Sequence, residues 1–200
     1  MNRREAIERT ALMLGYAVSA PALAGILKGC KAAPDLNYKP VFFNQDQAVL
    51  ISNVAEIIIP KTSTPGAKEA GVPRFIDTML NEVYSKKDQD GFLKGLAEFD
   101  EEVKRSCGDH FIDCGPEEQA AFVKKQHDAA FVKPVEGMST AWWGSGGGAE
   151  KPFILKVKEL TLLGFFTSEP GATQVLQYNQ VPGPYQGCLP LADVGKTWAT

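Results

Sequence analysis

Residues 44–60 read NQDQAVLISNVAEIIIP, and this stretch decides the fold class. Asn44 and Gln47 stand at the spacing of a capping box, in which the two side chains bond each other's backbone N–H groups at a helix start. The apolar residues that follow fall on one helical face: Leu50, Val54, Ile57 and Ile58. Pro60 lacks the backbone donor that another helical turn needs. The stretch therefore predicts an amphipathic helix between Asn44 and Pro60.

Four more stretches carry apolar residues at the same helical spacing. We expect helices from Pro73 to about Tyr84, from Phe92 to about Cys107, from Pro116 to about Ala130 and from Lys151 to Phe166, with a shorter one over 168–178. The helix from Pro73 should turn its apolar residues inward: Phe75, Ile76, Met79, Leu80, Val83 and Tyr84.

Glycine and proline dominate the remaining segments, residues 132–151 and the tail from Gln180 onward. Such segments are irregular connections. No stretch alternates apolar and polar residues as a half-buried strand would. The sequence therefore predicts an all-α protein, with a single compact helical domain and long irregular loops over residues 44–200.

The chain has 200 residues, of which 44% are hydrophobic and 22% charged, with a formal net charge of -3. This is the composition of one soluble domain. The slight acidic excess leaves no basic footprint for nucleic acid. After residue 29, no stretch is long and apolar enough to cross a bilayer as a helix.

The amino-terminal region has the layout of an export signal. Arg3 and Arg4 precede a run from Ala11 to Gly29 that is largely apolar or small. An adjacent arginine pair points to the twin-arginine route, which transports proteins that have already folded. We expect residues 1–29 to be such a signal segment and residues 30–43 to be a tether.

Cys30 ends this apolar run after Leu27 and Gly29. The arrangement resembles the lipobox of bacterial lipoproteins, in which the cysteine receives a lipid. We expect lipidation at Cys30 and attachment to a membrane through it. The alternative is an uncleaved signal anchor with an incidental cysteine.

The sequence shows no pattern of a catalytic or cofactor site. The glycine run at 144–148 lacks the ending of a phosphate-binding loop, and no dinucleotide fingerprint lies between a strand and a helix. Cys107, His110 and Cys114 do not have the spacing of zinc ligands. We therefore expect no catalytic, cofactor-binding or metal-binding residue in this chain.

The cysteines indicate one disulfide. An oxidising compartment favours pairing, and Cys107 and Cys114 flank a short turn between two expected helices. Their bond is the expected one, with a Cys114–Cys188 bond as the alternative. If Cys107 and Cys114 pair, Cys188 is left as a buried thiol or as the site of an intermolecular bond.

Aromatic residues in the irregular segments are candidates for binding a partner. Trp142 and Trp143 stand beside the glycine run, and are either a plug on their own domain or an anchor for another chain. The tail offers further partner-binding candidates: Tyr178, Pro182, Tyr185, Cys188 and Pro190. An irregular tail of this composition suits wrapping around a larger subunit.

The stretches LKVKELTLLGFFTSE at 155–169 and VPGPYQGC at 181–188 resemble the carboxy-terminal signature of the gluconate 2-dehydrogenase subunit 3 family. The helix ending EIIIP at 56–60, the loop from Thr62 to Gly71-Val72-Pro73, and Phe111 to Gln119 agree with it. The resemblance covers nearly the whole chain from Arg3 to Cys188.

This resemblance implies a non-catalytic small subunit of a periplasmic, membrane-associated dehydrogenase. The large partner would be an FAD-dependent subunit of the glucose-methanol-choline type that oxidises a sugar or sugar derivative, with a cytochrome carrying haem c as a possible electron acceptor. The small subunit would carry the export signal and stabilise the catalytic subunit. The FAD and the haem would belong to those partners, and family membership does not fix the substrate.

Two other classes of function remain open from the sequence. One is an exported lipoprotein that acts as an enzyme by itself, through a helical active site without a known motif. The other is a stand-alone structural lipoprotein. A flavin oxidoreductase that copurifies with the chain would favour the subunit.

Overall fold

The computed structural model describes residues 36–132, 151–181, 183–184 and 187–199. The chain divides into two units, Met1–Asn37 and Tyr38–Thr200, and the helices described below belong to the second. The predicted signal residues Arg3 and Arg4 and the predicted lipidation site Cys30 lie outside the described residues.

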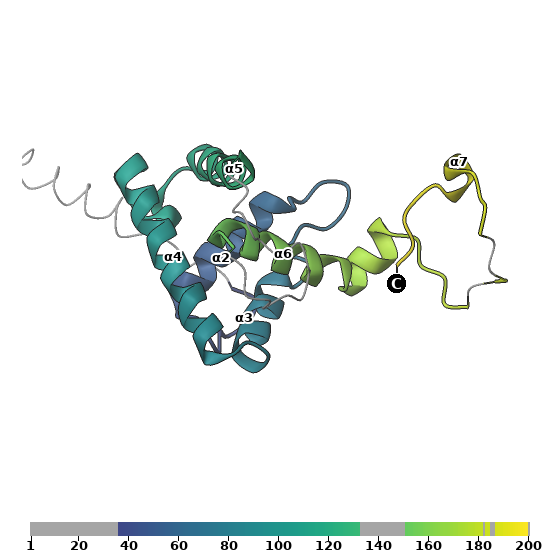
Figure 1. Ribbon diagram of the computed structural model, residues 1–200, viewed down its shortest axis with the longest axis horizontal. Helices are drawn as coiled ribbons and strands as arrows, with labels where there is room; N and C mark the ends of the chain where they lie inside the picture. The colour runs from purple at the N-terminus through teal and green to yellow at the C-terminus, as the bar shows by residue number, and fades with distance from the viewer. Residues whose placement is uncertain (1–35, 133–150, 182, 185–186, 200) are drawn as a thin grey trace, which may run out of the picture. The chain divides into compact units, whose positions relative to one another are not determined.

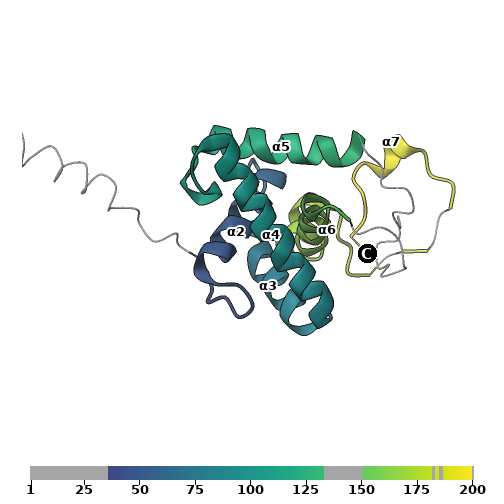
Figure 2. The same ribbon diagram turned by 60° about the vertical axis from the view of Figure 1, so that its left-hand side comes forward.

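Figures 1 and 2 show the helices of the second unit. Their bounds are α2 Gln45–Ile58, α3 Val72–Glu82, α4 Lys86–Cys107, η1 Phe111–Asp113, α5 Pro116–Val132, α6 Phe153–Phe166, η2 Gly171–Val175 and α7 Leu191–Val194. The described residues contain no β-strand, and an isolated bridge pairs Gln177 with Trp198. The all-α fold is confirmed.

Helix α2 begins with the predicted capping box. The Gln47 backbone N–H donates to Asn44 Oδ1 at 2.9 Å, and the Asn44 N–H donates to Gln47 Oε1 at 3.1 Å. Burial extends further around this helix than one apolar stripe, because Ala48 and Ile51 are also fully buried. The helix is therefore an inner element of the domain.

Helix α6 is the other inner element. It contacts α2, α3, α4 and α5, and Figure 2 shows it beside α4 and below α5. The Phe153 ring at its start lies 5.2 Å from the Phe92 ring and 5.5 Å from the Phe99 ring, both on α4. At its other end, Gly164 allows a close approach, because a Cβ there would lie 2.6 Å from Phe75 Cδ1.

Helix α3 departs from the prediction at the carboxy-terminal end of its apolar stripe. It ends at Glu82, and Val83 is 65% exposed, so its predicted inward position is wrong. The C-cap residue Val83 lies beyond the last helical turn, where the helical period no longer decides which way a side chain points. The buried face of α3 includes a charged residue that the pattern missed, Asp77, which is 1% exposed.

Asp77 fixes the segment that precedes α2. Its carboxylate accepts the backbone N–H groups of Val41 at 2.7 Å, Phe42 at 3.0 Å and Phe43 at 2.9 Å. Residues 38–43 were expected to belong to the tether, but they are bonded to α3 and form part of the domain. The boundary lies at Tyr38 because a buried carboxylate provides acceptors for this backbone.

The hydroxyl of Tyr38 is buried and has no hydrogen-bond partner among the described residues. Burial and, second, the nearby Asp77 carboxylate raise the pKa of Tyr38 above its ordinary value of 10.0. Both causes disfavour the phenolate, so Tyr38 stays neutral in the folded domain.

Candidate functional site

The tail leaves α6 through a turn that requires glycine. The Ser168 hydroxyl donates to the Phe165 carbonyl at 2.6 Å and accepts the Gly171 N–H at 3.2 Å. A Cβ on Gly171 would lie 1.9 Å from the same carbonyl oxygen, which leaves no room for a side chain. The helix expected over 168–178 is present in part, as the π-helix η2, and ends at Val175.

Gln177 closes the tail into a loop. Its backbone N–H donates to the Thr197 carbonyl and its carbonyl accepts the Ala199 N–H, both at 2.8 Å. The Gln177 side-chain amide also donates to the Val194 carbonyl. Gln177 is therefore joined to residues 194–199, and α7 is a short helical turn that precedes this junction.

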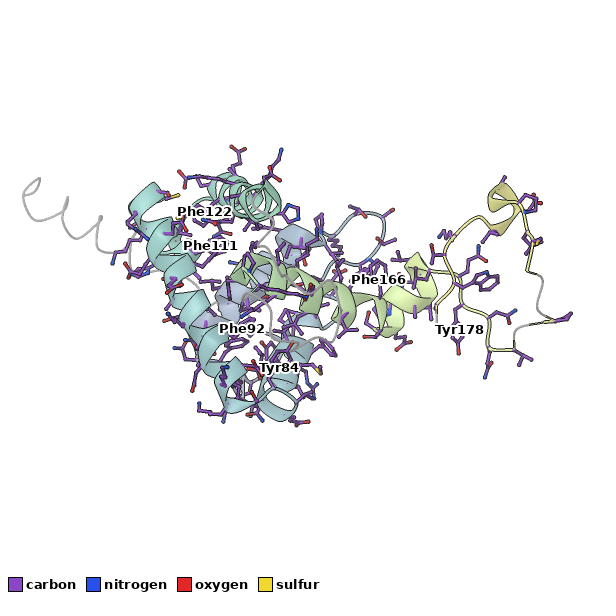
Figure 3. All side chains as sticks on the ribbon, viewed as in Figure 1. Tyr84, Phe92, Phe111, Phe122, Phe166 and Tyr178 are labelled. Atoms are coloured by element: carbon purple, nitrogen blue, oxygen red, sulfur yellow. The ribbon has the colours of Figure 1, made fainter. Side chains whose placement is uncertain are left out.

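The loop leaves large apolar side chains in contact with solvent. Tyr178 is 60% exposed, Val181 78%, Leu189 51% and Trp198 49%. Figure 3 shows Phe92, Phe111 and Phe122 among the helices, whereas Tyr178 lies in the tail. We call Tyr178, Val181, Leu189 and Trp198 the tail apolar set. These side chains contribute nothing to the buried core, which makes them candidates for contacts with another chain.

The described part of the predicted partner-binding set is exposed. Tyr178, Cys188 and Pro190 all face solvent. The buried-thiol interpretation of Cys188 is therefore wrong, because the loop that carries Cys188 does not pack it into the core. Four members of the set lie outside the described residues: Trp142, Trp143, Pro182 and Tyr185.

Cys107 and Cys114 meet at the corner between α4 and α5. Both are free thiols and half-buried, and Cys107 is a close neighbour of Cys114, whose Sγ donates to the His110 carbonyl at 3.4 Å. Burial, followed by the neighbouring Cys107, raises the pKa of Cys114 to about 11. The structure brings the two residues together as predicted without joining them, so the disulfide itself stays a prediction.

The same corner holds a histidine–carboxylate pair. Asp100 Oδ2 lies 2.6 Å from His110 Nδ1, and Asp100 Oδ1 accepts the Phe111 N–H at 2.8 Å. Phe111 is fully buried, with its ring 5.5 Å from that of Phe99. The pair thus fixes the chain that returns Phe111 to the core. Within the described ranges, no group of three or more His, Cys, Asp or Glu side chains could hold a metal ion.

A cleft of about 520 Å³ lies between α4, α5 and the start of α6. Phe99 and Phe153 contribute apolar lining, and Lys94, Glu98 and Lys151 are among its charged residues. Lys151 forms an ion pair with Glu159, with Nζ 2.8 Å from Oε1.

In the part of the chain that the structure describes, no helix combines the length and hydropathy needed to cross a membrane.

The family profile described as gluconate 2-dehydrogenase subunit 3 matches residues 45–183. The chain belongs to the gluconate 2-dehydrogenase subunit 3 family. Comparison with curated proteins and with solved structures finds no match. A subunit is by definition part of a larger assembly, so the family assignment points to a dehydrogenase complex rather than to a chain that acts alone.

The range that the family profile matches includes some of the predicted partner-binding residues of this chain and excludes others. It includes Trp142, Trp143 and Tyr178, and it ends before Tyr185 and Cys188. It also begins after the predicted signal and tether, so export and lipid attachment rest on residues outside the match.

Three of the four residues of the tail apolar set were not predicted from the sequence as partner-binding candidates: Val181, Leu189 and Trp198. A signal was available for Trp198, because a tryptophan in a proline- and glycine-rich tail has no helical stripe to join. No sequence signal marked Gln177, since its closing bonds are made largely by its backbone.

Proposed function

We propose that this chain is a non-catalytic accessory subunit of a membrane-associated periplasmic dehydrogenase of the FAD-dependent glucose-methanol-choline type. The complex oxidises a sugar or sugar derivative. The accessory subunit supplies the export signal through Arg3 and Arg4 and stabilises the catalytic subunit. The flavin is held by the large subunit, and a cytochrome with haem c is a possible electron acceptor.

The observation that carries the proposal is the tail loop. Tyr178 and Trp198 are large apolar side chains with 60% and 49% exposure, on a loop whose ends are joined at Gln177. A loop that is already closed loses less conformational entropy on binding than an open tail does. Aromatic anchors on such a loop are the residue types that dominate protein–protein hot spots.

Membership in a dehydrogenase subunit family supports the partner class. The proposed route supports the need for a separate export subunit, because FAD is inserted in the cytoplasm and a translocase for folded proteins preserves it. Cys30 would then hold the complex at the membrane through a lipid. Changing Cys30 to Ala removes the thiol that takes the lipid, and mass spectrometry of the wild-type mature chain checks whether that thiol is modified.

The central test is copurification of the full chain with its flavoprotein. Membranes are extracted, the small subunit is captured by affinity, and the flavin absorbance per small subunit is measured. The double substitution Tyr178→Ala/Trp198→Ala should lower the recovered flavin strongly. At about 2 kcal/mol for each hot-spot residue, the dissociation constant should rise by roughly 10²- to 10³-fold.

A matched control is Val83→Ala, because Val83 is 65% exposed and lies at the C-cap of α3 rather than in the tail. This control should retain the wild-type amount of flavin. Truncation after Tyr178 and the pair Trp142→Ala/Trp143→Ala extend the test to the other predicted contacts. Equal flavin recovery in the tail variants and the control would contradict the tail as the binding site. Flavin and turnover in the small subunit free of any other chain would contradict the accessory role itself.

A further inference from the structure

The corner between α4 and α5 presents two thiols to each other. Cys107 is the last residue of α4, and Gly108 turns the chain in the left-handed region with φ 86. Cys114 follows η1 directly, and Cys107 is the neighbouring ionisable group that acts on its thiol. The Cys114 Sγ also lies 3.4 Å from the His110 carbonyl oxygen and 3.7 Å from that of Asp109.

The corner keeps its shape without a covalent bond between these thiols. Asp100 holds the Phe111 N–H at 2.8 Å, and the Gln119 side-chain amide donates to the Phe111 carbonyl at 2.7 Å and to the Cys114 carbonyl at 3.2 Å. Phe111 itself is fully buried. Local hydrogen bonds and core packing therefore place Cys107 and Cys114 together in the reduced protein.

We propose that Cys107 and Cys114 form a dithiol site that a disulfide-bearing oxidant closes after the domain has folded, with Cys107 as the first thiol to react. The inference does not depend on the proposed dehydrogenase partner, because it concerns one corner of this chain and its reaction with a disulfide. It goes beyond the predicted disulfide in two ways. It states which thiol attacks the oxidant first, and it states that folding precedes disulfide formation.

The reaction is two successive thiol–disulfide exchanges. The Cys107 thiolate attacks one sulfur of the oxidant, which breaks the oxidant's S–S bond, forms a mixed disulfide and releases one oxidant thiol. Cys114 then attacks the Cys107 sulfur and releases the second oxidant thiol. Two cysteine protons are transferred in all, the two cysteine sulfurs are oxidised, and the oxidant's disulfide is reduced to two thiols.

The order of attack follows from the contacts of Cys114. Its Sγ donates to the His110 carbonyl at 3.4 Å and to the Asp109 carbonyl at 3.7 Å, and only the protonated thiol can make these hydrogen bonds. Its burial, the contact with Cys107, and the nearby Glu118 and Asp109 carboxylates raise its pKa to about 11. The thiolate is the attacking species, so at neutral pH Cys114 is a slow initiator compared with an ordinary cysteine. Once Cys107 carries the oxidant, Cys114 lies beside the sulfur that it must attack, and proximity compensates for its low thiolate fraction.

The first experiment maps the bond in the full chain after treatment with oxidised glutathione under native conditions. Trypsin cleaves after Arg105 and Lys124, so both cysteines fall in one peptide, residues 106–124. Closure should lower the mass of this peptide by about 2 Da, the loss of two hydrogen atoms. A crosslinked peptide containing Cys188, or an unchanged peptide 106–124, would overturn the proposal.

The second experiment tests the order of attack in a Cys30→Ser/Cys188→Ser background. Adding Cys114→Ser should trap one glutathione on Cys107 at nearly the rate of closure. Adding Cys107→Ser should slow glutathione addition at Cys114 by tenfold or more at pH 7. Equal rates in the two variants would overturn Cys107 as the first thiol.

The third experiment tests the order of folding and oxidation in the Cys30→Ser/Cys188→Ser background. The reduced protein should unfold cooperatively, and closure should raise Tm by only about 5 °C, since the bond staples a short corner that is already fixed. A reduced protein without a cooperative transition would show that the bond is needed for folding, and would overturn closure after folding.

Discussion

Replacing Asp77 by Ala should destabilise the domain more than the loss of one surface charge would. Asp77 is 1% exposed and accepts three backbone N–H groups from a segment 34 to 36 residues earlier in the chain. Alanine leaves those donors without an acceptor. The Phe43 donor is buried, while those of Val41 and Phe42 are part-buried and can be reached by water more easily.

The magnitude follows from these three bonds. An unsatisfied buried donor costs about 1–3 kcal/mol, and each bond that water can partly replace contributes about 0.5–1.5 kcal/mol. The free energy of unfolding should therefore fall by about 3 kcal/mol for Asp77→Ala. For a chain of this length that corresponds to a decrease in Tm of about 6–12 °C.

Asp77→Asn should fall between the wild type and Asp77→Ala. The amide keeps one oxygen, which can still accept from Phe42 and Phe43, but its NH₂ group then faces the Val41 N–H. The matched control is Glu82→Ala, an exposed carboxylate on the same helix, which should change the free energy of unfolding by less than about 0.5 kcal/mol.

Urea and thermal unfolding followed by circular dichroism give the stabilities. Hydrogen exchange adds a local readout, because the amides of Val41, Phe42 and Phe43 should lose protection in Asp77→Ala while the α4 amides keep theirs below global unfolding. If Asp77→Ala is no less stable than Glu82→Ala, or if the three amides exchange at the wild-type rate, the assigned role of Asp77 is refuted.

Three further changes have expected outcomes. Gly164→Ala should lower the free energy of unfolding by about 1–2 kcal/mol, because its Cβ would lie 2.6 Å from Phe75 Cδ1, and adding Phe75→Leu should restore part of the loss in a urea double-mutant cycle. Tyr38→Phe should keep or raise stability at neutral pH, since the hydroxyl has no partner among the described residues. Folding raises the pKa of Tyr38, so the contribution of this group to the free energy of unfolding is complete below pH 10.0 and is lost progressively as the pH rises above it. Between pH 8 and pH 11, the free energy of unfolding should therefore fall less steeply for Tyr38→Phe than for the wild type. Changing Arg3 and Arg4 to Lys should leave the chain and its flavoprotein in the cytoplasm by fractionation, and delivery of both to the periplasm would contradict the twin-arginine route.

Local signals in the sequence account for most of the helical architecture. The Asn44–Gln47 capping box forms as predicted, and α4 ends at Cys107 where Gly108 follows. Both depend on residues within one or two turns of the helix end, so a single sequence contains all the information needed. Pro116 likewise stands at the first position of α5, as expected for a residue without a backbone donor.

The features that the sequence did not reveal depend on distant partners. Asp77 occupies a buried position that composition assigns to solvent, and only the approach of residues 41–43 explains it. The exposure of Cys188 depends on the course of the tail loop, which is closed by backbone bonds of Gln177 to residues far along the chain. No periodic pattern encodes such contacts.

In the candidate site too, local residue type was predictable from the sequence, whereas contacts between distant residues were not. Residue type alone made Tyr178 a candidate for partner binding and predicted its exposure, because an aromatic side chain in an irregular tail has no core to enter. Residue type could not show that the tail is a closed loop, nor that Trp198 lies next to the closure at Gln177. Only the three-dimensional structure shows that Trp198 and Gln177, which are far apart in the sequence, lie side by side.

The proposed export route sets the order in which the two surfaces of this subunit act. A translocase for folded proteins requires that the flavoprotein bind before transport, so the tail apolar set must be available on the folded domain in the cytoplasm. Thiols stay reduced there, and the Asp100 and Gln119 contacts keep the α4–α5 corner folded without a bond between Cys107 and Cys114. Under this proposed route, closure of the dithiol would take place on the oxidising side of the membrane, after assembly with the flavoprotein. On this order, a Cys107→Ser/Cys114→Ser subunit should bind and export its partner normally, and should differ from the wild type only in its stability after transport.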